Sequence, residues 1–311
     1  MSDIPGVRRV AVVGAGTIGS SWAALFLAKG LDVIVTDANP NAEGALRHFV
    51  EAAWPALTTL GLAPDATPDR LTFQPDLGLT CEGADFVQEN ATEREALKAA
   101  LLTDIDAATR PEVVIASSSS ALTVTSMQSR CRHPDRVVLG HPFNPPHLVP
   151  LVEVVGGERT SAEVLDRATA FNAALGKTPV RLNKEVYGHI ANRLQAAVFR
   201  EAINLLDQGV ASLADIDRAM ADGPGLRWSL MGPFLTFHLG GGQGGMASFM
   251  TQFAQMQTDL WRDLGDPVLD ERLQRVVCEK MEAETAGRSV ADLAAERDRL
   301  ILSVLAARTS R

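Results

Sequence analysis

VAVVGAGTIGSSWAALFLAKGLDVIVTD, residues 10–37, places a glycine-rich turn between a short apolar run and a run with helical spacing. Val10–Val13 is the expected strand, and Ile18–Lys29 the expected helix, because its apolar residues recur on one face. A second strand, Val33–Thr36, follows directly. This order predicts a strand–helix–strand unit within a mostly parallel sheet.

The glycines of this turn are spaced as Gly14-x-Gly16-x-x-Gly19. In a dinucleotide-binding loop the first glycine makes the turn, the second lets the backbone approach a pyrophosphate, and the third lets helix and strand pack closely. Backbone N–H groups at the helix N-terminus, from Thr17 and Ile18, suit the phosphates. These five residues, 14 and 16–19, therefore form a candidate cofactor loop.

Asp37 ends the second strand, 18 residues after Gly19. From this position a carboxylate can accept hydrogen bonds from the adenosine ribose, and it would repel the extra phosphate of NADP. NAD is thus the expected cofactor. A flavin dinucleotide could use the same loop, and a glycine-rich turn of another α/β fold is the alternative to both.

Further short strands are expected at Phe86–Gln88, Val113–Ala116, Val137–Leu139 and Leu151–Val155, alternating with helices at Asn41–Leu60 and Thr92–Ala108, the latter with its charges outward. After Leu182 only helical runs follow, at Gly188–Asp207, Leu213–Ala221, Phe249–Asp263 and Val268–Glu284. We therefore expect two domains, an α/β domain over 1–185 and an all-helical domain over 186–311.

The composition disfavours several functions for this 311-residue chain. A net charge of −9 disfavours a basic groove for nucleic acid, and a single tyrosine with 5% aromatic residues disfavours base stacking. Cys81, Cys131 and Cys278 form no CxxC pair, so neither a disulfide framework nor a zinc site is expected. No signal peptide or membrane-spanning run is recognisable, and we expect a cytoplasmic protein without a membrane partner.

GHPFNPPHLVPLVEVVGG, residues 140–157, holds a histidine and a carboxylate that suit acid–base chemistry. An imidazole titrates near neutral pH, and a carboxylate can fix its tautomer. His141 as the base and Glu153 as its partner are the interpretation favoured by the presence of the cofactor loop elsewhere in the chain. The alternatives are a solvent-exposed loop histidine and an edge carboxylate facing water. His189 has no comparable partner and is interpreted as structural.

Several stretches together resemble the L-3-hydroxyacyl-CoA dehydrogenase family: VAVVGAGTIGSSWA, ASSSSALTVTS, GHPFNPPHLVPLVEVV, YGHIANRL and GLRWSLMGPFLTFHL. Within it the chain is similar to the branch that contains lambda-crystallin (L-gulonate 3-dehydrogenase) and L-carnitine dehydrogenase. The resemblance implies an N-terminal Rossmann-type domain, a C-terminal helical domain that makes a homodimer, and reversible oxidation of a 3-hydroxyl by NAD.

The resemblance also implies roles for individual residues. His141, Glu153, Ser120 and Asn192 fall on the family's catalytic positions, the last two as hydrogen-bond donors to the substrate oxygen. Glu93 and Lys98 fall on positions near the nicotinamide, although such charges can equally form a solvated helix face. Arg227 is a candidate for binding a substrate carboxylate, or else a structural arginine. Asn192 could also be a plain helix-surface residue.

The expected function is oxidation of a small free L-3-hydroxy acid resembling gulonate, carnitine or 3-hydroxybutyrate. The alternative is a short-chain L-3-hydroxyacyl-CoA dehydrogenase acting on the CoA thioester. A third possibility, a dinucleotide-binding protein without catalysis, is disfavoured because such a protein need not retain all four catalytic positions. The glycine-rich stretch 240–245 is interpreted as either a mobile lid or a plain connection between helices.

Overall fold

The computed structural model describes residue 4 and residues 6–309, so the N-terminal stretch in which no targeting signal was expected lies partly outside it. Contacts divide the chain into two compact units, Met1–Asn192 and Arg193–Arg311. The first unit ends slightly beyond the boundary at residues 185 and 186 that the sequence suggested. Its last two residues, Ala191 and Asn192, already belong to a helix that continues into the second unit.

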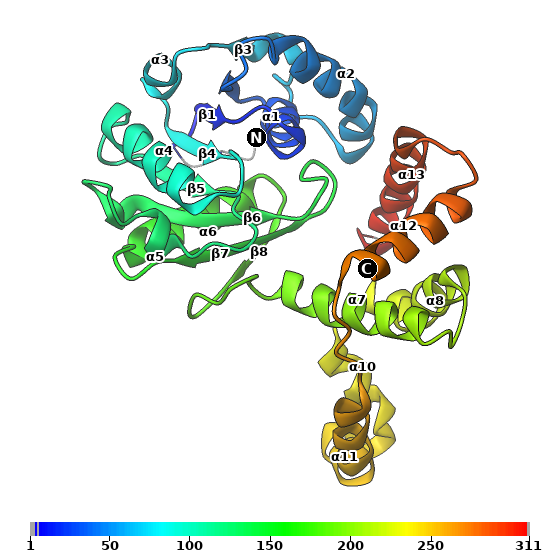
Figure 1. Ribbon diagram of the computed structural model, residues 1–311. Coiled ribbons are helices and arrows are strands. Elements are labelled where there is room, and N and C mark those ends of the chain that lie inside the picture. The colour runs from blue at the N-terminus through cyan, green and yellow to red at the C-terminus, as the bar shows by residue number, and fades with distance from the viewer. Residues whose placement is uncertain (1–3, 5, 310–311) are drawn as a thin grey trace. The chain divides into compact units, whose positions relative to one another are not determined.

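One sheet of eight strands forms the centre of the first unit, in the order β3-β2-β1-β4-β5-β6-β7-β8 (Figure 1). The strands are β1 Arg9–Val13, β2 Asp32–Thr36, β3 Leu71–Phe73, β4 Phe86–Glu89, β5 Val114–Ser117, β6 Val137–Pro142, β7 Leu151–Gly156 and β8 Thr178–Arg181. Neighbouring strands are parallel, except that β6 and β7 are antiparallel. The β3-β2-β1-β4 order, reversing at β1, is that of a Rossmann-type sheet.

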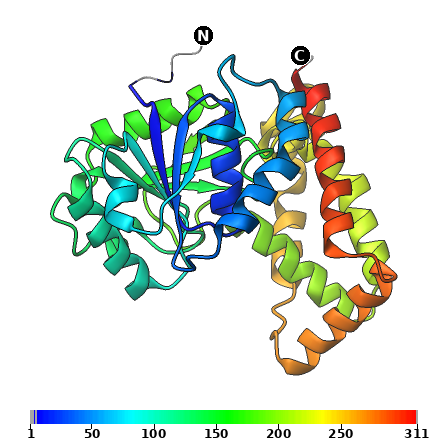
Figure 2. The same cartoon turned by 90° about the horizontal axis from the view of Figure 1, so that it is seen from above.

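Helices cover both faces of this sheet. Helices α1 Thr17–Ala28, α2 Glu43–Leu60 and α6 Ala162–Ala174 contribute to the buried cluster on one face. Helices α3 Leu77–Cys81, α4 Glu95–Ala108 and α5 Val124–Met127 contribute to the cluster on the other. Figure 2 shows the dark blue α1 beside the central strands. Because both faces are buried, the strands are apolar almost throughout rather than alternating.

The sequence-based elements of this unit are largely confirmed, with three kinds of difference. The helices α3, α5 and α6 were not predicted. The strands β3 and β8 were missed, because β3 has only three residues and β8, TPVR, contains a proline and lies at the sheet edge. The expectation that the charges of α4 point outward was wrong for Lys98 and Asp106, which are both buried. Each has a charged partner, described below.

The second unit is helical throughout its described residues. Its helices are α7 Ala191–Asp207, α8 Leu213–Met220, α9 Leu226–Trp228, α10 Pro233–Gly240, α11 Gly245–Asp263, α12 Glu271–Thr285 and α13 Val290–Thr309. Arg272 of α12 pairs with Asp207 of α7 at 2.8 Å. The stretch 240–245 connects α10 to α11. Among the described helices, none combines the length and apolarity that crossing a membrane requires.

Candidate active site

The turn between β1 and α1 requires glycine at two of its three positions. Gly14 has a φ of 99°, and a Cβ there would lie 2.9 Å from the backbone of Asn90. A Cβ on Gly19 would lie 1.8 Å from the carbonyl oxygen of Gly14, so helix and turn approach as closely as their backbones allow. The glycine spacing thus fixes the local fold here.

The same turn fits a dinucleotide pyrophosphate. Helix α1 begins at Thr17, and its N-cap, Gly16, offers no side chain to the free N–H groups of the first turn. Nothing lies within 4 Å of a Cβ placed on Gly16, so the backbone is open to a ligand on that side. Such a helix N-terminus attracts phosphate through its N–H groups and its dipole.

Asp37 lies beside this turn at the end of β2. Its Oδ2 accepts a hydrogen bond from the N–H of Ala15 at 2.7 Å, and its Oδ1 accepts one from the N–H of Asn39 at 2.8 Å. The carboxylate is therefore held against the glycine turn. This is the relation between acid and loop that adenosine-ribose recognition needs.

His141 and Glu153 face each other across the only antiparallel strand pair of the described sheet. They are register partners on β6 and β7, and His141 Nδ1 lies 2.9 Å from Glu153 Oε2. Both side chains are buried, with residue exposures of 5% and 1%. Directly opposite residues of antiparallel strands project on the same face, so the strand register itself brings the two together.

The second oxygen of Glu153 is also fully used. Its Oε1 accepts hydrogen bonds from the N–H groups of Ile190 at 2.8 Å and Ala191 at 3.0 Å, where α7 begins. Burial alone would raise the pKa of Glu153, but the hydrogen bonds from His141 and from these two N–H groups hold it below its ordinary value. The carboxylate is thus anionic, and a proton on His141 Nδ1 points at it.

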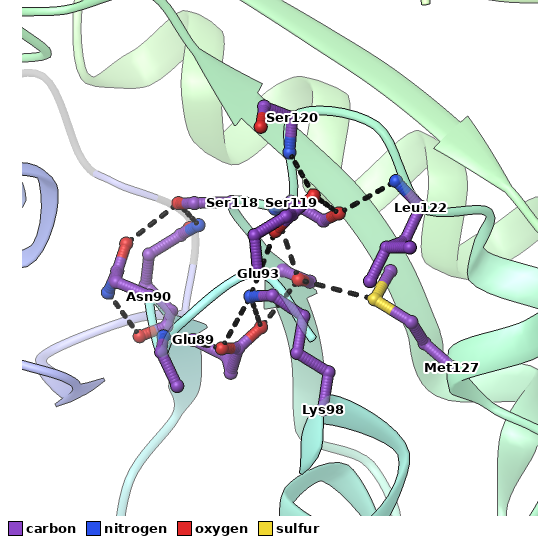
Figure 3. Close-up of polar contacts among 12 residues, drawn as sticks. Glu89, Asn90, Glu93, Lys98, Ser118, Ser119, Ser120, Leu122 and Met127 are labelled. Atoms are coloured by element: carbon purple, nitrogen blue, oxygen red, sulfur yellow. Dashed lines mark hydrogen bonds and ion pairs between the residues drawn. The ribbon is translucent and has the colours of Figure 1, made fainter. Parts of the chain in front are cut away.

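The serine loop, residues 117–120, begins at the last residue of β5 and is fixed from two sides, by Glu93 (Figure 3) and by Asn192. Glu93 Oε1 accepts hydrogen bonds from the N–H groups of Ser120 and Ala121, both at 3.0 Å, and from the Ser119 hydroxyl at 2.5 Å. The carbonyl oxygen of Ser120 accepts a hydrogen bond from Asn192 Nδ2 at 3.0 Å. Ser120 and Asn192, two of the expected catalytic residues, are therefore in direct contact.

Glu93 and Lys98, the expected nicotinamide-side pair, belong to one network of charges in which Lys98 is buried and Glu93 is partly exposed. Lys98 Nζ lies 2.8 Å from Glu89 Oε1 and 3.7 Å from Glu93 Oε2, with its side chain 1% exposed (Figure 3). The alternative of a solvated helix face is therefore wrong for Lys98. Burial would raise the pKa of Glu93, yet the Ser119 hydroxyl and the Lys98 ammonium keep it lowered.

Glu89 was missed by the sequence interpretation, although it is the centre of that network. It is fully buried, accepts two bonds from Lys98 Nζ at 2.8 and 3.0 Å, and accepts the Ser117 hydroxyl at 2.5 Å. A carboxylate ending an apolar strand, nine residues before a lysine, was the available signal. Glu89 ties α4 to the start of the serine loop.

Arg227 lies apart from these residues in the chain. It is exposed on the short helix α9 of the second unit, directly after the π-helical turn Ala221–Gly225. The first unit alone thus brings together the glycine turn, Asp37, the serine loop, Asn192 and the His141–Glu153 pair.

These features define a class of protein, the dinucleotide-dependent dehydrogenases. The sheet and glycine turn suit the cofactor, and a buried imidazole beside an anionic carboxylate suits removal of a hydroxyl proton while hydride leaves the same carbon. The chain belongs to the 3-hydroxyacyl-CoA dehydrogenase family. Residues 9–186 match the family's NAD binding domain and residues 188–276 its C-terminal domain.

Two L-carnitine dehydrogenases resemble the chain over nearly its whole length. An L-carnitine dehydrogenase of Streptomyces coelicolor is 50% identical over 307 residues, covering 99% of this chain and 96% of the relative. One of Pseudomonas aeruginosa is 47% identical with the same coverage. The crystal structure of a 5-formyl-3-hydroxy-2-methylpyridine 4-carboxylic acid 5-dehydrogenase, an NAD⁺-dependent dismutase, superposes with a TM-score of 0.84 at 27% identity, covering 98% and 99% of the two chains. The chain is therefore an NAD-dependent dehydrogenase that acts on a CH–OH group.

Proposed function

We propose that this protein is an L-carnitine dehydrogenase, which oxidises the 3-hydroxyl of L-carnitine to the ketone. The choice of substrate rests on one observation, the identity of 45–50% to L-carnitine dehydrogenases along the whole chain. Carnitine is a free 3-hydroxy acid, in agreement with the sequence-based expectation. When bound, NAD⁺ supplies the oxidant that accepts hydride from carbon 3.

In this proposal His141 is the general base. With Nδ1–H donating to Glu153, the lone pair of Nε2 is the one available to the substrate hydroxyl. Nε2 takes the hydroxyl proton as the carbon–hydrogen bond breaks, and the anionic Glu153 stabilises the imidazolium that results. In the reverse direction the same nitrogen returns the proton to the ketone oxygen.

Ser120 and Asn192 are proposed to donate hydrogen bonds to the reacting oxygen. Ser120 is held through its own N–H and carbonyl, and its hydroxyl donates to no group among the described residues. Asn192 Nδ2 donates one hydrogen to Ser120 and has a second to offer. Donors placed before the reaction stabilise negative charge as it develops on the oxygen.

The substrate carboxylate is assigned to Arg227, whose planar guanidinium matches a carboxylate in two hydrogen bonds. Arg227→Ala should raise KM for the free acid strongly while leaving KM for NAD⁺ near its original value. Arg262→Ala, an exposed arginine of α11, is the matched control. An unchanged KM for the acid in Arg227→Ala would reject this assignment.

The substrate proposal is tested by following NADH absorbance with L-carnitine, D-carnitine, L-gulonate, L-3-hydroxybutyrate and L-3-hydroxybutyryl-CoA. We expect turnover with L-carnitine to exceed the others in kcat/KM. His141→Ala should be nearly inactive. The control, His133→Ala, should be fully active, because His133 is exposed and precedes the N-terminal end of β6, whereas His141 lies near its C-terminal end. Preference for the CoA thioester would replace the proposal by the 3-hydroxyacyl-CoA alternative.

We further propose that the protein is a homodimer. Supporting this, helix α10 exposes Phe234, Leu235 and Leu239, with 81% of Phe234 accessible in the single chain. Apolar side chains grouped in this way mark an interface. Sedimentation should give twice the mass of the chain, and Phe234→Asp should lower it toward the monomer. A monomeric wild type at micromolar concentration would contradict the proposal.

A further inference from the structure

His189 occupies an unusual position between β8 and α7. Its backbone φ is 53°, in the left-handed region that residues other than glycine rarely adopt, and the residue is 2% exposed. Its Nε2 lies 3.2 Å from the carbonyl oxygen of Ser119. Its Nδ1 is buried and has no hydrogen-bond partner among the described residues. Because buried polar atoms are normally paired, this arrangement calls for an explanation.

The backbone conformation of His189 serves Glu153. The chain reverses at His189, and the next two N–H groups, of Ile190 and Ala191, then point at Glu153 Oε1. A left-handed residue other than glycine costs of order 1 kcal/mol and persists only where the surroundings enforce it. At this position the enforcing contacts are the two hydrogen bonds to the carboxylate and the one to the serine loop.

The proposed catalytic group has two parts, the His141–Glu153 pair and the serine loop. The ring of His189 contacts both of them. Its centroid is 5.1 Å from that of His141, and its Nε2 reaches the serine loop. We propose that His189 is a positioning residue, which holds the serine loop against the His141–Glu153 pair. Together with Asn192, it fixes the carbonyl groups of two successive residues, Ser119 and Ser120.

Burial, aided by the nearby His141, favours the neutral form of the His189 imidazole by lowering its pKa. Burial lowers the pKa of His189, and the neighbouring His141 lowers it further, against the opposing effects of the Ser119 carbonyl and of Glu153 and Glu93. A neutral ring that donates from Nε2 carries no proton on Nδ1. His189 therefore does not compete with His141 for the proton of the substrate, although it lies next to it.

A spectroscopic experiment tests this without any substrate. In ¹⁵N-labelled protein, one imidazole should be the neutral Nε2–H tautomer near neutral pH and should titrate below the ordinary histidine pKa of about 6.5. Its signals should disappear in His189→Gln and persist in His133→Gln. Titration of the His189 ring near that ordinary value, or an Nδ1–H tautomer, would overturn the inference.

Kinetics supply the second test, which rests on the proposed function for its substrate. His189→Phe keeps the ring without the donor, and His189→Gln keeps a donor near the position of Nε2. We expect kcat to fall about tenfold or more in the Phe variant, since small displacements of catalytic groups are costly, with KM for NAD⁺ unchanged. The Gln variant should recover most of kcat.

A failure of the substrate proposal can be distinguished from a failure of the inference about His189. If the wild type does not oxidise L-carnitine, the substrate proposal fails, and the kinetic comparison is made with whichever acid of the panel is oxidised. If both variants lose the same activity, or lose only melting temperature with kcat unchanged, the positioning role of His189 is rejected whatever the substrate.

Discussion

Replacing Glu153 by glutamine should disable the base, His141, while leaving the shape of the side chain at position 153 almost unchanged. The wild-type carboxylate accepts three hydrogen bonds, from His141, Ile190 and Ala191. Glutamine has one acceptor oxygen and one donor nitrogen. With the oxygen toward the two backbone N–H groups, the amide nitrogen faces His141 Nδ1. The imidazole must then carry its proton on Nε2, where it cannot accept the substrate proton.

The expected loss follows from that change of tautomer. General acid–base catalysis contributes about 10²–10⁴-fold, and an imidazole fixed in the wrong tautomer by a comparable substitution loses about 10⁴ in kcat. We therefore expect Glu153→Gln to lower kcat by at least about 10²-fold with little effect on KM for NAD⁺. Loss of the charge-assisted bond should also lower the free energy of unfolding by about 2 kcal/mol.

The assay is steady-state NADH formation, run well below the melting temperature of each variant. Asp106→Asn is the matched control, because Asp106 is also a buried carboxylate, paired with Arg136 at 2.6 Å and bonded to the N–H groups of Arg132 and His133. It should lose about 3–5 kcal/mol of stability but keep its kcat. A kcat within tenfold of wild type in Glu153→Gln, or an equal loss in both variants, would refute the reasoning.

Three further predictions concern the remaining buried groups and the glycine turn. Gly19→Ala should abolish NAD⁺ binding in calorimetry, because its Cβ would lie 1.8 Å from the Gly14 oxygen. The control, Gly44→Ala in α2, has open space around its Cβ and should raise the free energy of unfolding by up to about 1 kcal/mol. Normal NAD⁺ affinity in Gly19→Ala would contradict this prediction. Lys98→Met should lower the free energy of unfolding in denaturant by about 3–5 kcal/mol, because it leaves Glu89 buried without its cation. Adding Glu89→Gln should restore part of that loss. If the losses of the two single variants simply add in the double variant, the two residues do not interact. Burial lowers the pKa of Lys177 to about 7, so the unfolded chain binds a proton that the folded chain has released, and the free energy of unfolding should rise from about pH 7 to about pH 10.4. Lys177→Met should remove that rise, and the exposed Lys184→Met should not.

The parts of the fold that could be predicted from the sequence are those in which local pattern and local structure coincide. The glycine turn is one, because its glycine spacing is local and the closest contact at Gly19 is with Gly14, although Gly14 itself packs against the distant Asn90. The approach of His141 to Glu153 was another, since only eight residues separate β6 from β7. In both cases the chain has few ways to connect the elements, so composition decides the geometry.

Some parts could not be predicted because they depend on contacts between residues far apart in the chain. Others could not be predicted because a residue lies buried where its type is usually exposed. Charges on a helix usually face water, and the one local signal for the burial of Lys98 was Glu89, a carboxylate at the end of the preceding strand. His189 was interpreted as structural because the sequence shows no carboxylate partner for it; its contact, the Ser119 carbonyl, is 70 residues away and belongs to the backbone. A pattern of side chains in the sequence does not indicate which backbone carbonyl group will accept a hydrogen bond.

The antiparallel pairing of β6 and β7 explains why stability and chemistry are inseparable in this sheet. Val152 and Val154 belong to the buried cluster on one face, while Leu139 and Val155 belong to the cluster on the other. His141 and Glu153 share the second face, because side chains alternate along a strand. Slipping β7 by one residue would force both valines off their core and push a carboxylate into it, at a cost of several kcal/mol. The apolar residues that stabilise the sheet thereby select the one register in which the imidazole faces its carboxylate.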